Sequence, residues 1–161
     1  MTDKQVRVAM ENFLQSKNSP MWGYADYMWV LARNTGISGS LAISIAQAET
    51  QCATDPNADQ IMVDGHNAWG FGHSPGTHGY LFPTWPDAMS ALSNQLASFI
   101  YGQDARFPAC DTVYKLSGVW VNGNFEAPAS GWATIVGEVM QQFGGNPNQL
   151  QRSRLWQHQH P

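Results

Sequence analysis

Apolar residues recur every three or four positions in several stretches of the chain, which is the spacing of a helix with one buried face. The predicted helices span residues 6–14, 19–35, 38–51, 85–101, 112–116 and 133–143. Ser19 and Thr84 stand where N-caps are expected, and Gly36 and Gly144 follow helices as stop signals. The pattern predicts an α+β domain that is mainly α, with a helical core and a small irregular or β lobe.

The stretch from Ser38 to Gln51 is apolar nearly all round and carries its only carboxylate, Glu49, at its end. Ser38 or Ser40 can cap its N-terminus, and no charged residue occurs between Arg33 and Glu49. An apolar surrounding disfavours the ionised carboxylate, so we expect a raised pKa that suits Glu49 to general acid catalysis. Alternatively, Glu49 is simply the first polar residue where the helix reaches solvent.

Two loops follow this helix. Residues 52–64 contain three carboxylates, Asp55, Asp59 and Asp64, and residues 65–86 contain none but are dense in glycine, proline, histidine and aromatic residues. A loop of this length inside a compact domain usually serves a function. The sequence allows short strands at 68–72 and 78–82, but we expect little regular structure in this loop.

Length and composition favour one domain. The 161 residues suffice for one hydrophobic core, so we predict a single domain at 1–145 and a polar C-terminal tail at 146–161, with a helical turn near 150–156. Only 12% of the residues are charged and 43% are hydrophobic, a composition that suits contact with uncharged polymers such as glycans. The net charge of −4 and the pI of about 5.6 argue against nucleic acid or an anionic membrane as a partner.

The first fifteen residues are polar and amphipathic, and they lack the apolar core of a signal peptide or a membrane-spanning helix. We therefore expect no membrane insertion and no export signal in this chain. Cys52 and Cys110 allow one disulfide, and two free thiols are the alternative.

Two motifs together resemble the lysozyme-like N-acetylglucosaminidases of bacterial autolysins and phage endolysins, similar to glycoside hydrolase family 73. They are AQAET at 46–50 and HNAWGFG at 66–72, in which Glu49, Asn67 and Gly70 match the family pattern. The stretch FPTWPDAMSALSNQLASF looks like the helix that follows the family's cleft, and Trp132 stands where members carry a substrate-facing Tyr. The chain departs from the pattern after Glu49, and the stretch from 65 to 86 lacks the family's frequent second acid.

The resemblance implies a lysozyme-like fold and cleavage of the β-1,4 glycan strand of peptidoglycan, with Glu49 as the general acid. The activity would be that of an N-acetylglucosaminidase, a muramidase or a lytic transglycosylase. Of the loop acids, Asp64 is the candidate for the second catalytic carboxylate, since it is nearest in sequence to Asn67. Without a second acid, the acetamido oxygen of the sugar could act as nucleophile, or the enzyme could form an anhydro sugar.

The candidate substrate-binding residues are one amide and several aromatic side chains: Asn67, Trp69, Phe71, Tyr80, Trp85 and Trp132. For the aromatic residues the alternative is a place in the core. His66, His73 and His78 share a loop, but their spacing fixes no ligand geometry, so we expect neither a metal nor a cofactor.

The expected partner is the peptidoglycan glycan strand, and the expected state is a monomer. Such an enzyme acts outside the cytoplasm on the cell wall, as a phage-encoded, virion-associated or excised part of a secreted protein. A non-catalytic glycan-binding module or a structural virion or tail protein is the alternative function.

Overall fold

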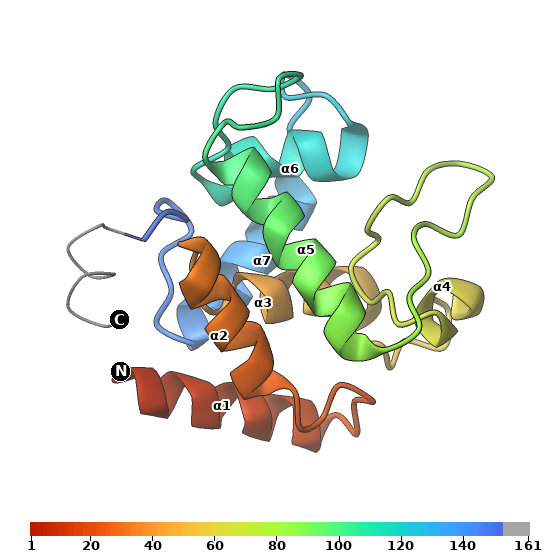
Figure 1. Cartoon of the computed structure of the whole chain (residues 1–161), viewed down its shortest axis with the longest axis vertical. Helices are drawn as coiled ribbons and strands as arrows, with labels where there is room; N and C mark the ends of the chain where they lie inside the picture. The colour runs from red at the N-terminus through yellow and green to blue at the C-terminus, as the bar shows by residue number, and fades with distance from the viewer. Residues whose placement is uncertain (153–161) are drawn as a thin grey trace.

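The computed structural model describes residues 1–152, and this part of the chain is mainly helical, as predicted (Figure 1). The helices are α1 (Asp3–Ser16), α2 (Ala25–Thr35), α3 (Leu41–Thr50), α4 (Gln60–Asp64), α5 (Trp85–Ile100), α6 (Val113–Asn122) and α7 (Ser130–Gln142). The short strands that the sequence allowed at 68–72 and 78–82 do not form, and this stretch has little regular structure, as expected. Within residues 1–152 the strand-like pairing is limited to an isolated antiparallel bridge between Ile37 and Gln151.

Side-chain caps set the start of several helices. Thr2 forms a capping box with Gln5, and Thr84 accepts a hydrogen bond from the backbone N–H of Asp87 at 3.2 Å, as its position predicted. The short helix α4 was not predicted. It begins because the Asp59 carboxylate accepts hydrogen bonds from the N–H groups of its first turn.

Two predicted boundaries are wrong. Ser19 does not cap α2, because the helix begins six residues later; its hydroxyl accepts from the N–H of Met21 at 3.1 Å and donates to the carbonyl of Cys52 at 2.7 Å. The helix α6 continues past Leu116 to Asn122 despite Gly118. A Cβ at Gly118 would lie 2.4 Å from the carbonyl oxygen of Asn124, so glycine allows the following loop to pass close to the helix.

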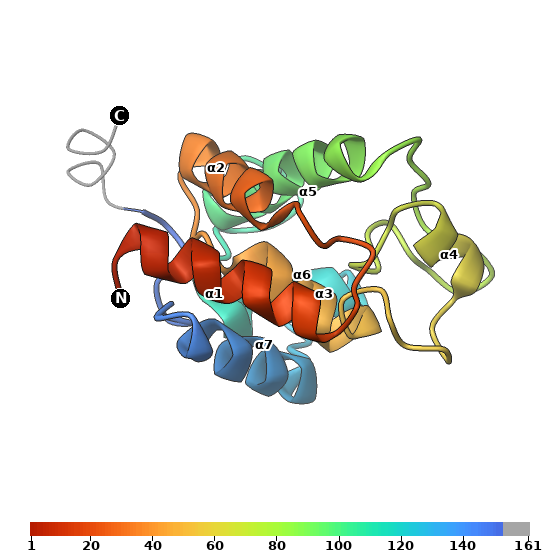
Figure 2. The same cartoon turned by 90° about the horizontal axis from the view of Figure 1, so that it is seen from below.

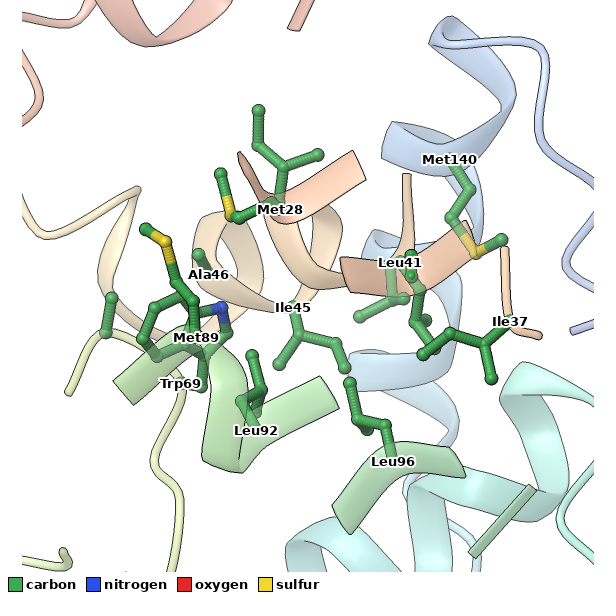
Figure 3. Packing of buried hydrophobic residues seen from close by; sticks show 14 of the residues in the cluster. Met28, Ile37, Leu41, Ile45, Ala46, Trp69, Met89, Leu92, Leu96 and Met140 are labelled. Atoms are coloured by element: carbon green, nitrogen blue, oxygen red, sulfur yellow. The ribbon is translucent and has the colours of Figure 1, made fainter. Parts of the chain in front are cut away.

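The helix α3 lies in the middle of the fold (Figure 2). It packs against α7 and α2, while α5 and α1 pack on α2, and α6 packs on α7. Its side chains Leu41, Ile45 and Ala46 are fully buried in one cluster with residues of the surrounding helices (Figure 3). The helix predicted at 38–51 to be apolar nearly all round therefore lies in the core of the molecule.

The first residues of the predicted polar tail pack on the helices. Leu150 is fully buried, and the backbone of 147–152 is hydrogen-bonded to residues 36, 38, 111 and 113. No helical turn begins at Leu150, and the rest of the predicted turn lies outside the described residues. In residues 1–152 there is no helix with the length and apolarity needed to cross a membrane.

Candidate active site

The C-terminal end of α3, which carries Glu49, is held by an unusual backbone turn. Gln51, Cys52 and Ala53 all have left-handed φ angles, between 51° and 65°, a conformation that costs a non-glycine residue about 1–2 kcal/mol. The buried hydroxyl of Thr50 donates to the carbonyl of Ala68 at 2.8 Å and accepts from the N–H of Ala53. These contacts tie the end of α3 to the loop that contains Asn67, and they explain why Thr50 follows the glutamate.

The Glu49 carboxyl group has different surroundings at its two oxygens. Oε1 accepts a hydrogen bond from the indole N–H of Trp132, in the first turn of α7, at 2.8 Å. Oε2 faces Gly70, where an added Cβ would lie only 2.9 Å away. Burial raises the pKa of Glu49 above its ordinary value, and the Trp132 hydrogen bond lowers it by a smaller amount. The predicted direction of the shift is confirmed.

Asn67 organises the loop beside Glu49 from the inside. Its amide nitrogen donates to the carbonyls of Phe71 and Tyr80, and its oxygen accepts from the N–H groups of Trp69 and Phe71. The side chain is fully buried. The prediction that Asn67 contacts the glycan is therefore corrected, because its polar atoms are engaged within the protein and it acts by shaping the loop.

The predicted stacking residues divide into core and surface. Trp69 is fully buried and donates its indole N–H to the carbonyl of Ala42 at 2.9 Å, and Trp85 packs against its ring. Both rings therefore belong to the core, which is the alternative that the sequence left open for them. Phe71 is 9% exposed, whereas Tyr80 is 56% exposed and meets Phe71 edge to face. Trp132 contacts Glu49 directly and is partly buried.

A pocket of about 380 Å³ adjoins this arrangement through Gly70. The loop after Asn67 forms one side, and the ends of α5 and α6 with the segment around Arg106 form the other. The lining combines aromatic rings with a few polar side chains, an arrangement typical of sites for small organic ligands: Phe71, His73, Tyr80, Gln95, Phe99, Arg106, Trp120 and Asn122.

The structure does not bring Asp64 to Glu49. Asp64 is exposed at the end of α4, which lies at the edge of the molecule away from α3 (Figures 1 and 2). Burial and Trp132 are the influences on the Glu49 pKa, and no carboxylate of residues 1–152 is among them. The pairing of Glu49 with Asp64 predicted from sequence proximity is therefore not observed.

The three loop histidines have separate surroundings. His66 shares a hydrogen bond of 2.8 Å with the carbonyl of Phe82, and His78 shares one of 2.7 Å with the Asp59 carboxylate. His73 lies 3.9 Å from the same carboxylate. Across residues 1–152, no three His, Cys, Asp or Glu side chains are grouped so that they could hold a metal ion.

Both cysteines are buried free thiols, which decides between the alternatives left by the sequence. Burial raises the pKa of Cys52 to about 12 and that of Cys110 to about 11. Neither thiol is therefore activated as a nucleophile.

Comparisons of the chain with protein-family models, with curated proteins and with solved structures found no match. Sequence reasoning missed the pocket residues Trp120 and Asn122, because the helix predicted at 112–116 ends too early. Trp120 and Asn122 instead end α6 and face the pocket. The helical spacing of Leu116, Val119 and Trp120 was the available signal.

Proposed function

We propose that the protein is a peptidoglycan hydrolase with a lysozyme-like helical domain, which cleaves the β-1,4 glycan strand with Glu49 as general acid. The observation that carries the proposal is the part-buried Glu49 carboxyl group with a raised pKa. Trp132 holds one of its oxygens, and the other faces Gly70, which also lines the pocket. The motif resemblance at Glu49, Asn67 and Gly70 supports the same family of activities. In this chain the small lobe consists of the short helix α4 and an irregular loop without strands over residues 65–84.

The arrangement favours one oxygen as the proton donor. Oε1 accepts the indole N–H, and a carboxyl group accepts better through its carbonyl oxygen than through its hydroxyl. The acid proton is therefore favoured on Oε2, which faces Gly70. This proton moves to the glycosidic oxygen as the bond from that oxygen to the anomeric carbon breaks.

The developing charge on the anomeric carbon needs a second group. Because Asp64 lies apart from Glu49, we favour a group of the substrate itself. The acetamido oxygen of the same sugar can bond to the carbon and later give way to water. Alternatively, the 6-hydroxyl of a muramyl residue can attack and yield an anhydro sugar, with its proton returning to Glu49.

A glycan-binding module is the second candidate, favoured by the exposed position of Asp64 at the end of α4, apart from α3. Turbidity of purified bacterial cell walls separates the two functions. The hydrolase is expected to clear the suspension, and a binding module sediments with the walls but leaves the turbidity unchanged. Sedimentation with no clearing, over a pH range from acid to neutral, would refute the enzymatic proposal.

A further inference from the structure

We propose that the pocket beside Gly70 is a subsite for an N-acylated sugar that carries a carboxylate, and that Arg106 selects for this carboxylate. The inference rests on the proposed function, because it assumes that the ligand of the pocket is part of a glycan strand.

The apolar part of the pocket suits the face of a sugar ring. Phe71 and Trp120 are stacked at 5.8 Å with an angle of 26° between their planes. The indole N–H of Trp120 donates to the carbonyl of Trp69 at 2.9 Å, which fixes the orientation of the ring. Tyr80 is exposed beside them, and its ring fills the space over Gly72. Preorganised aromatic rings give contact area at little cost in conformational entropy.

The polar part of the pocket suits an acetamido group and an anion. Gln95 supplies an amide side chain that can pair with an acetamido group, and Asn122, whose amide nitrogen donates to the carbonyl of Ala127 at 2.6 Å, can accept from the acetamido N–H through its amide oxygen. Arg106 is the only Lys, Arg, Asp or Glu among the lining residues, and His73 is the other titratable side chain with a basic nitrogen. The pocket therefore offers a guanidinium group that can pair with an anion, and Arg106 shares its charge with Asp104, which lies outside the lining.

Asp104 orients Arg106 without facing the pocket. Its carboxylate accepts from Nε at 3.0 Å and from Nη2 at 2.8 Å, and Asp104 is not among the lining residues. These two bonds use two of the five guanidinium N–H groups, so three remain for a ligand. The Arg106 hydrogen bonds lower the pKa of Asp104 to about 2, so near neutral pH Asp104 is ionised and accepts both hydrogen bonds from Arg106.

The alternating sugars of peptidoglycan differ in charge. N-acetylglucosamine is neutral, whereas N-acetylmuramic acid carries a lactyl carboxyl group, which is ionised when no stem peptide is attached. A planar guanidinium group pairs with a carboxylate through two parallel hydrogen bonds. The subsite therefore favours the muramyl residue with a free lactyl group, or a carboxylate of its stem peptide.

The test compares two tetrasaccharides in the Glu49→Gln protein, which prevents turnover. The probes are chitotetraose, which is neutral, and a tetrasaccharide of alternating N-acetylglucosamine and N-acetylmuramic acid with free lactyl carboxylates. We expect the acidic tetrasaccharide to bind about fivefold more tightly at low salt, as an exposed ion pair allows. Arg106→Gln removes this difference and leaves the affinity for chitotetraose unchanged. Added salt reduces the difference in the same direction.

Lys115→Gln is the matched control, because Lys115 also pairs with a neighbouring aspartate, Asp111, but lies outside the pocket. It should keep the preference for the acidic probe. Equal binding of both probes, or an equal loss of both in Arg106→Gln, would overturn the subsite but leave the glycan-cleaving function standing. If neither tetrasaccharide binds, the proposed function fails and the subsite fails with it.

Discussion

The indole N–H of Trp132 donates a hydrogen bond of 2.8 Å to Oε1 of Glu49, across 83 positions of the sequence. Glu49 ends α3 and Trp132 begins α7, the two helices that pack against each other at the centre of the fold. The bond sets the orientation of the carboxyl group and opposes the effect of burial on its pKa. Trp132 is therefore a positioning residue for Glu49.

Trp132→Phe should shift the pH dependence of activity. The N–H of Trp132 stabilises the ionised carboxylate, so its removal raises the Glu49 pKa further. A general acid loses activity as the pH rises through its pKa, and the alkaline limb of the kcat profile is therefore expected at higher pH. We also expect kcat to fall about tenfold because the carboxyl group is less well oriented.

Trp22→Phe is the control for this variant, since Trp22 is an exposed tryptophan outside the site. It should leave both kcat and its pH profile unchanged. An alkaline limb that stays in place or moves to lower pH in Trp132→Phe would contradict the role given to the indole.

Gly70→Ala should inactivate the protein by crowding the proton donor. The new Cβ would lie 2.9 Å from Oε2 of Glu49, and the φ of +64° disfavours alanine by about 1 kcal/mol or more. Gly76→Ala separates the two effects, because Gly76 also has a positive φ, +81°, but has no atom within 4 Å of its Cβ position. We expect similar small losses in the free energy of unfolding, with wall lysis lost in Gly70→Ala alone. Equal lysis by the two variants would mean that Oε2 is not the reacting atom.

Asp64→Asn should lower the rate of wall lysis only modestly, by less than about threefold, because Asp64 is exposed at the end of α4 and apart from Glu49. Asp26→Asn, on the exposed face of α2, provides the baseline for removing a surface carboxylate. A loss of two orders of magnitude or more in folded Asp64→Asn protein would make Asp64 the catalytic base and exclude the substrate-assisted mechanism.

The cysteines should give two titratable thiols in protein that is unfolded without prior reduction, because both are free. Reductant should leave the melting temperature unchanged. In the folded protein, alkylation should be slow, since burial raises the pKa of both thiols. Detection of no free thiol in the unfolded protein would show that the bridge exists.

The sequence predicts the buried setting of Glu49 well, because a helix that is apolar nearly all round is stable only when it is packed in a core. The sequence could not show which aromatic residues of 66–85 are buried and which are exposed. Trp69 and Tyr80 lie in the same kind of Gly-rich segment, and their burial depends on long-range contacts, such as that of Trp69 with Ala42. Asn67 was misassigned for the same reason, since an amide that binds backbone carbonyls and one that binds a ligand look alike in sequence.

Long-range contacts also decide where Asp64 and Trp132 lie relative to Glu49. Closeness in sequence to Asn67 suggested Asp64, but α4 points that residue into solvent at the edge of the molecule. Trp132 was expected to face the substrate, and only the packing of α7 on α3 brings its N–H to Glu49.

The central claim, that Glu49 protonates the leaving oxygen of a glycosidic bond, is tested most directly by mass spectrometry of peptidoglycan digested with the wild-type protein and with Glu49→Gln. Gln keeps the shape of the side chain and can still accept from Trp132, but it cannot donate the acid proton. From the wild type we predict soluble muropeptides with new reducing ends or anhydro-muramyl ends. Glu49→Gln should still bind walls, but its rate of glycan cleavage should be lower by roughly two to four orders of magnitude. Glycan cleavage by Glu49→Gln at more than about a tenth of the wild-type rate, or wild-type products cut only in the peptide stem, would contradict the account.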